Sequence, residues 1–186
     1  MADQANEGLL SPFLKRRRIA AAAPFLRGQV LDIGCGSGAL AELIESSNYL
    51  GVDRDPISLD KAKKSFPSHQ FQTEMPATTS EFDTVVALAV IEHVPDPSRF
   101  LTDLAGFLPK KGFGQIICTT PHPAFDWVHD AGSVLGLFSK HASDEHEALL
   151  GFGSLKSAAR ASGLKLDTYK KFLFGANQLA IFKTDN

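Results

Sequence analysis

Short apolar runs alternate with amphipathic stretches along most of this 186-residue chain. The apolar runs contain many β-branched residues and end at Gly, Pro, Asp or Ser, which is typical of strands. The stretches between them place apolar residues three or four positions apart, which is typical of helices. We expect strands over 30–33, 49–52, 69–73, 82–89 and 114–120, and helices over 39–46, 55–66 and 98–107.

This alternation predicts an α/β fold with a mostly parallel sheet covered by helices on both faces. We expect one domain over 1–186, opened by a helical segment at 1–28. A last helix at 153–162 precedes two strands, 164–174 and 177–183, that form a hairpin around Gly175. Ligands of such sheets bind outside the carboxyl ends of the strands.

A glycine-rich turn follows the first predicted strand. Gly34, Cys35, Gly36 and Gly38 stand between that strand and the next helical stretch. Glycine lets the backbone N–H groups approach a ligand closely, and Asp53, at the end of the second strand, is placed to accept ribose hydroxyls. Glycine clusters also form plain turns, but the strand, loop, helix and acid occur here in order. They predict a Rossmann-like site for a ligand that contains adenosine.

Asp32 precedes the first glycine and affects which nucleotide would bind. At ~4 Å and an effective dielectric constant near 20, its carboxylate would repel a pyrophosphate by about 4 kcal/mol. It would attract a cationic ligand by a similar amount. S-adenosylmethionine (SAM) carries an ammonium and a sulfonium, so Asp32 favours SAM over NAD or FAD. A second nucleotide-binding half is also missing, which disfavours an NAD-dependent oxidoreductase.

Four segments now stand in order: 30–38, 51–53, 81–86 and 90–97. Together they resemble class I SAM-dependent methyltransferases, in particular the bacterial small-molecule group that includes ubiquinone-type O-methyltransferases. The resemblance covers about residues 9–120. It implies a Rossmann-like seven-stranded sheet of order 3-2-1-4-5-7-6, with the last strand antiparallel.

The resemblance also implies a set of cofactor-binding residues. Arg16 or Arg18, within the basic run 15–18, would pair with the carboxylate of SAM. A basic run is also typical of a solvated helix face, or of a patch that binds anions or nucleic acid. Glu74, after the third strand, would contact adenine. The full set expected to bind SAM is Arg18, Asp32, Gly34, Cys35, Gly36, Gly38, Asp53, Arg54, Glu74, Met75 and Leu88.

Methyl transfer depends mainly on orientation, and a general base helps only when the acceptor must lose a proton. Histidine suits that role near neutral pH. His93 follows the fourth strand, in the Glu-His-Val segment shared with the family, and His122 follows the fifth. Both are candidate catalytic residues, while the alternative for His93 is that it only orders a turn.

Residues 121–152 interrupt the periodic pattern, and long loops in small domains are usually functional. We expect a substrate lid there, in which Phe125, Trp127 and Phe138 either line an acceptor pocket or pack the lid down. The segment also holds side chains that can ligate metals: His122, Asp126, His129, His141, Asp144 and His146. Their spacing matches no tight zinc pattern, so we expect solvated side chains and no metal.

The net charge of −2 predicts no overall attraction to nucleic acid or to an anionic membrane. Two cysteines, no long apolar run and no signal-peptide pattern favour a cytoplasmic protein. We therefore expect a methyltransferase that acts on an O- or N-nucleophile of a small-molecule acceptor. The alternative is a non-catalytic SAM-binding or regulatory protein. Homodimer formation stays open.

Overall fold

The computed structural model describes residues 11–77, 79–123 and 150–184. Its seven strands form one sheet of order β3-β2-β1-β4-β5-β7-β6, as expected. All pairs are parallel except β5–β7 and β6–β7, so the last strand is antiparallel, again as expected. The strands are β1 (Val30–Ile33), β2 (Tyr49–Val52), β3 (Gln70–Gln72), β4 (Thr84–Leu88), β5 (Gln115–Pro121), β6 (Leu164–Phe172) and β7 (Asn177–Thr184).

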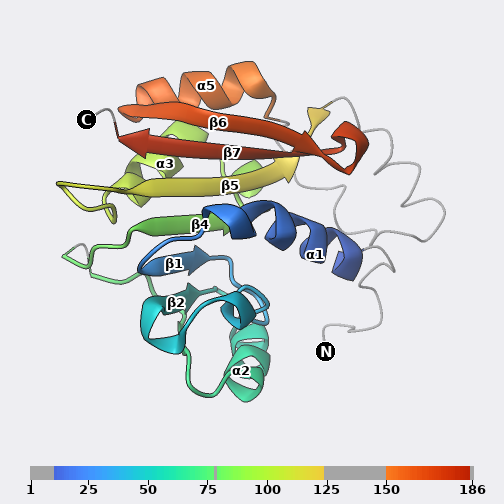
Figure 1. Cartoon of the computed structure of the whole chain (residues 1–186), viewed down its shortest axis with the longest axis vertical. Coiled ribbons are helices and arrows are strands. Elements are labelled where there is room, and N and C mark those ends of the chain that lie inside the picture. The colour runs from blue at the N-terminus through green and yellow to red at the C-terminus, as the bar shows by residue number, and fades with distance from the viewer. Residues whose placement is uncertain (1–10, 78, 124–149, 185–186) are drawn as a thin grey trace.

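Helices cover both faces of this sheet (Figure 1). The described α-helices are α1 (Ser11–Ala22), α2 (Pro56–Ser65), α3 (Pro97–Ala105) and α5 (Phe152–Ala161). Short 3₁₀ turns are η1 (Ala23–Phe25), η2 (Ala41–Leu43), η3 (Ser46–Asn48), η4 (Ile91–His93) and η7 (Leu173–Gly175). Side chains of α1 and α2 belong to one buried cluster, and those of α3 and α5 belong to the other.

Alternation along the central strands assigns the side chains to these two clusters. Val85 and Ala87 of β4 pack with α3 and α5, whereas Val86 packs with α1 and α2. Val85, Val86 and Ala87 are all fully buried. A central parallel strand buried on both faces therefore carries the nearly continuous apolar run that the sequence shows.

The helix expected over 39–46 is wrong. Only the 3₁₀ turn η2 forms, with the Ile44 N–H donating to the Ala41 carbonyl at 3.2 Å. Ile44 is extended, and its carbonyl oxygen lies 2.9 Å from His69 Nε2. Burial of Leu40 and Ala41 and this contact override the helix propensity of the segment. The glycine loop therefore does not open an α-helix.

Gln178 of β7 forms hydrogen bonds near both ends of the segment expected to form the lid. Its side chain is fully buried, and its Nε2 donates to the Pro121 carbonyl at 2.9 Å and to the Leu150 carbonyl. The Tyr169 hydroxyl donates to Gln178 Oε1 at 2.8 Å. Residues 124–149, which make up most of the expected lid, lie outside the described residues.

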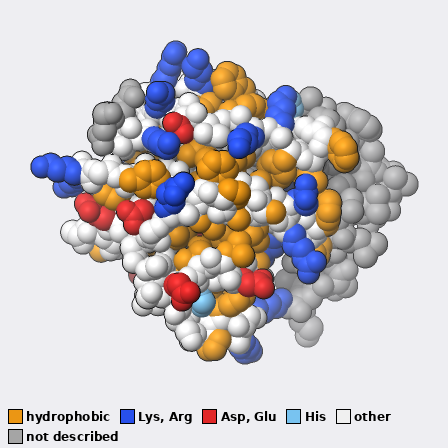
Figure 2. All heavy atoms as spheres, in the orientation of Figure 1, with side chains coloured by type: hydrophobic (Ala, Val, Ile, Leu, Met, Phe, Trp, Pro, Cys, Tyr) orange, Lys and Arg blue, Asp and Glu red, His pale blue; other side chains and the backbone are white. Residues whose placement is uncertain are grey.

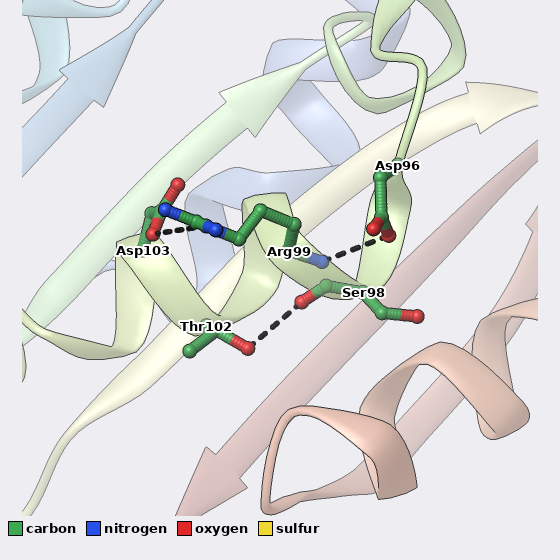
Figure 3. Close-up of polar contacts among 5 residues, drawn as sticks. All are labelled: Asp96, Ser98, Arg99, Thr102 and Asp103. Atoms are coloured by element: carbon green, nitrogen blue, oxygen red, sulfur yellow. Dashed lines mark hydrogen bonds and ion pairs between the residues drawn. The ribbon is translucent and has the colours of Figure 1, made fainter.

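Helix α3 begins at an Asp-Pro pair. Asp96 Oδ1 accepts from the Arg99 N–H at 3.0 Å, and Pro97 occupies the first turn (Figure 3). Further along, Arg99 Nε lies 3.3 Å from Asp103 Oδ1, but both side chains are largely exposed. The cap satisfies a backbone N–H that has no partner within the helix, whereas the ion pair is screened by water.

We therefore expect Asp96→Ala to destabilise the protein by about 1 kcal/mol. The matched variant Asp103→Ala, on the same helix, should lower the free energy of unfolding by only about 0.3 kcal/mol. Urea unfolding of the two variants checks this difference. Equal effects of both substitutions would show that the cap does not stabilise the start of α3.

Candidate functional site

The glycine loop and Asp53 meet at the carboxyl ends of β1 and β2. The Gly36 N–H donates to Asp53 Oδ2 at 2.7 Å, and the Asp55 N–H donates to Asp53 Oδ1 at 2.9 Å. Ile33 and Val52 pair in register just before these residues. The half-buried Asp53 carboxylate is thus fixed by backbone donors on both oxygens. Each oxygen can still accept a further hydrogen bond.

The other loop N–H groups are also used within the protein. The Gly34 and Cys35 N–H groups donate to the Val52 carbonyl at 2.8 and 3.1 Å, and the Gly38 N–H donates to the Cys35 carbonyl at 3.0 Å. This corrects the expectation that these N–H groups face a ligand. Because these N–H groups donate to carbonyl groups of the protein, they are not available to a pyrophosphate.

Two glycines of the loop have positive φ values that disfavour a side chain. Gly34 has φ +70°, and a Cβ there would also lie only 2.6 Å from Cγ2 of Val90. Gly36 has φ +54°, and a Cβ there would lie 3.6 Å from Nζ of Lys15, an ordinary contact distance. Gly34 is therefore required by both its conformation and its packing, and Gly36 by its conformation alone.

Lys15 of α1 reaches the glycine loop, which the sequence analysis did not predict. Its Nζ donates to Ser37 Oγ at 3.1 Å. Arg18 turns toward the sheet instead, with its Nε donating to Asn177 Oδ1 at 2.9 Å, and Arg16 is exposed. A sequence signal existed: Lys15 stands four residues before Ile19, on the stripe of α1 that packs on the sheet.

Asp32 lies beneath this loop and is 4 % exposed. The Tyr49 hydroxyl donates to its Oδ2 at 2.8 Å. Burial raises the pKa of Asp32 to about 7, although the Tyr49 hydrogen bond and the positive charge of Lys15 oppose the rise. The carboxylate expected to be fully charged is therefore about half protonated at neutral pH, and a nearby cation would favour its ionised form.

An open cavity of about 500 Å³ is lined by the turn that follows β3 and by Leu50 of β2. Glu74 and Met75 lie on its rim, where both are exposed, and Leu50 contributes an apolar wall. The Glu74 carbonyl accepts from Gln72 Nε2 at 2.7 Å, which shapes the turn after β3. Arg54 is exposed next to Asp53, while half-buried Leu88 packs in the cluster shared with α1.

The two candidate histidines follow neighbouring parallel strands. His93 is the last residue of η4, just after β4, and is exposed. His122 follows β5, and its backbone N–H donates to the Ala176 carbonyl at 2.9 Å. Partial burial and the positive charge of Lys171 lower the pKa of His122. Its neutral form therefore predominates at pH 7, as a proton acceptor requires.

Strained backbone and buried polar atoms also occur between β4 and β5. Ala89 has φ +58°, an unusual value for a residue other than glycine. Glu92 is 3 % exposed, and its Oε2 has no hydrogen-bond partner among the described residues. Burial raises the pKa of Glu92.

No group of three or more His, Cys, Asp or Glu side chains in the described ranges could hold a metal ion. Most of the histidine-rich segment lies outside those ranges.

The raised pKa of Asp32 predicts a specific pH dependence of stability. The unfolded chain loses this proton near pH 4, whereas the folded protein keeps it until about pH 7. The contribution of Asp32 to the free energy of unfolding should therefore fall as the pH rises from 4 to 7, by roughly 4 kcal/mol at most. Asp32→Asn should remove this fall and be more stable than the unsubstituted protein at pH 8.

Urea unfolding between pH 4 and 8 checks this expectation. Tyr49→Phe is the matched control, because it removes the hydrogen bond that favours the carboxylate and should make the fall steeper. Parallel stability curves for the Asp32→Asn variant and the unsubstituted protein would contradict it.

Comparison with known proteins now identifies the family. Residues 5–169 match the sequence profile of the methyltransferase domain. The ubiquinone biosynthesis O-methyltransferase of Cereibacter sphaeroides is 34 % identical over 114 residues, which cover 56 % of this chain and 45 % of that protein. That of Dechloromonas aromatica is 34 % identical over 106 residues, covering 50 % and 44 %. The matches thus span less than half the length of these relatives.

Solved structures show the same fold. Magnesium protoporphyrin IX methyltransferase of Synechocystis, with bound S-adenosylhomocysteine, superimposes with a TM-score of 0.69 at 15 % identity over 98 % of this chain and 90 % of that one. A SAM-dependent methyltransferase of Mesorhizobium loti gives 0.64 at 16 % identity, covering 94 % and 97 %. The chain therefore belongs to the methyltransferase domain family and has the fold of SAM-dependent methyltransferases.

Proposed function

We propose that this protein transfers the methyl group of SAM to an oxygen or nitrogen of a small-molecule acceptor. The observation that carries the proposal is the pairing of the Gly36 N–H with Asp53 at 2.7 Å. It holds a carboxylate with spare acceptor capacity at the end of β2, where the two hydroxyls of a ribose can donate to it. The internal use of the other loop N–H groups disfavours a dinucleotide.

The neighbouring groups suit the remaining parts of SAM. The cavity beside Glu74 and Met75 has the apolar wall and polar rim that an adenine ring needs. Lys15, at the glycine loop, is placed to pair with the carboxylate of the methionine part. We assign this role to Lys15 in preference to Arg18, because Arg18 Nε is engaged by Asn177.

The charge of Asp32 is coupled to the cofactor in this proposal. SAM would bring positive charge next to a carboxyl group whose pKa is about 7. The ligand would therefore favour the ionised form of Asp32 and release part of a proton when it binds. Asp32 thus favours a cationic donor without imposing a full buried charge on the empty protein at neutral pH.

The reaction is an in-line displacement at the methyl carbon. A lone pair of the acceptor forms the new bond to that carbon while the bond from carbon to sulfur breaks, and S-adenosylhomocysteine leaves with the electron pair on a neutral sulfur. The acceptor proton passes to a base. We propose His122 for this role, because its neutral form predominates, with His93 as the second candidate.

The first test concerns the cofactor. Asp53→Ala should weaken SAM binding about ten- to hundredfold, because it removes the carboxylate that accepts from the ribose. Asp60→Ala, an exposed acid on α2, is the matched control and should leave the affinity unchanged. Calorimetric titration measures both, with thermal unfolding to verify the fold. An unchanged affinity for Asp53→Ala would contradict the assigned contact.

The second test concerns catalysis. Incubation with methyl-labelled SAM and a panel of phenols, amines and carboxylates should give label transfer to at least one acceptor. His122→Asn should slow that transfer about a hundredfold or more while SAM affinity stays the same. If His93→Asn slows transfer and His122→Asn does not, the base is misassigned. SAM binding without transfer to any acceptor would favour a non-catalytic SAM-binding protein.

A further inference from the structure

The positive charges of this chain are concentrated in two segments that the fold brings together. Residues 11–29 contain five Lys and Arg residues, residues 168–184 contain three, and neither segment contains Asp or Glu. The rest of the chain contains the other 11 Lys and Arg residues and all 21 Asp and Glu residues. Lys183 pairs with Asp167, which directly precedes the second segment, at 2.9 Å. The overall net charge of −2 therefore conceals a basic part of the molecule that rests on the other seven Lys and Arg residues.

Contacts between α1, η1 and the β6–β7 pair join these segments into one surface, which we call the basic face. Arg18 of α1 binds Asn177 of β7, and Lys170 Nζ of β6 lies 5.0 Å from the ring centroid of Phe25 in η1. Figure 1 shows α1 in front of the sheet, with β5 between it and the β6–β7 pair. The charge concentration in the sequence is thus also a concentration in space.

A groove of about 270 Å³ lies on the basic face. Phe25, Phe172 and Leu179 give it an apolar lining, and Lys170 and Lys171 stand beside them with exposed side chains. Figure 2 views this side of the molecule and shows hydrophobic side chains with Lys and Arg side chains around them. A groove with an apolar lining and cationic edges is complementary to an anionic amphiphile.

The turn between β6 and β7 adds an exposed aromatic side chain next to these lysines. Phe174 is fully exposed, and Leu173 and Phe174 have φ values of +52° and +55°. Such values are strained for bulky residues, and exposure of a large apolar side chain to water is also unfavourable. Phe174 is nonetheless exposed, three residues after Lys171.

We propose that the basic face docks on the surface of an anionic phospholipid bilayer. Lys170 and Lys171 contact the headgroup phosphates, and Phe174 enters the boundary between headgroups and acyl chains. The apolar groove and the exposed phenylalanine favour a lipid surface over nucleic acid, whose phosphate backbone needs cations but no apolar groove. This is surface docking, since no helix in the described part of the chain has the length and apolar character to cross a bilayer.

One part of the docked surface, the β6–β7 turn, lies at the end of the sheet that carries the candidate site. In Figure 1 the β6–β7 turn stands at the same end as the tips of the β1, β4 and β5 arrows. The positive charge of Lys171 acts on His122, so the two side chains are electrostatic neighbours. Docking would therefore bring the candidate site close to the bilayer, but it does not require the acceptor to be a lipid.

Vesicle co-sedimentation tests the proposal. The full chain should sediment with phosphatidylcholine vesicles that contain about a third phosphatidylglycerol, but not with pure phosphatidylcholine, and about 1 M salt should weaken the binding. Replacing both lysines, Lys170→Gln with Lys171→Gln, should weaken it about tenfold or more. Phe174→Ser should also weaken it while leaving the salt dependence in place.

The matched control is the pair Lys63→Gln and Lys64→Gln, two exposed lysines on α2, which should leave vesicle binding unchanged. Thermal unfolding and SAM titration verify that every variant is folded. Equal sedimentation with both kinds of vesicle, or an equal loss from the control pair, would overturn the proposal. Binding to transfer RNA without binding to vesicles would overturn it in favour of nucleic acid.

Discussion

The hydrogen bond from the Gly36 N–H to the Asp53 carboxylate orients that acid at the ends of β1 and β2, where we propose that the cofactor binds. The parallel register of Ile33 with Val52 brings the two segments together, and the positive φ of Gly36 points its N–H toward the acid. The orientation of the Asp53 carboxylate therefore depends on both the strand pairing and the loop conformation. The proposed cofactor site depends on it, because a displaced Asp53 could not receive a ribose at this edge.

Asp32 shows how the same site affects stability. The fold buries a carboxyl group beneath the loop and offers it one hydroxyl partner, Tyr49. Burial of a charge is unfavourable, so the Asp32 carboxyl group has a pKa of about 7 and is only partly ionised near neutral pH. A cationic ligand would reverse that balance. The feature that makes the empty protein less stable at high pH is thus the feature that would favour SAM.

Much of the fold could be predicted from local patterns. The apolar runs and the amphipathic stretches between them predicted the strands and most helices, because these signals are contained in short segments. The strand order 3-2-1-4-5-7-6 was implied by the resemblance to class I methyltransferases, and the structure confirms it. The missed features depend on contacts between distant residues. Packing of Leu40 and Ala41 replaced a helix over 39–46 by a 3₁₀ turn, and the placement of Lys15 against Ser37 required the crossing of α1 over the sheet.

The glycine loop and Asp53 lie together because adjacent parallel strands end at one edge of the sheet. The binding of SAM by these residues stays a prediction. The sequence could not show that the loop N–H groups would be used internally, nor that the charges of two segments 140 or more residues apart would share a face. Both properties arise only when the strands are assembled.

A crystal structure of the protein with S-adenosylhomocysteine tests the central claim most directly. The account predicts that both ribose hydroxyls donate to Asp53, that adenine occupies the cavity beside Glu74 and Met75, and that the homocysteine end lies at Lys15 and the glycine loop. A ligand bound away from Asp53, or a glycine loop that rearranges to expose its N–H groups to a phosphate, would contradict it.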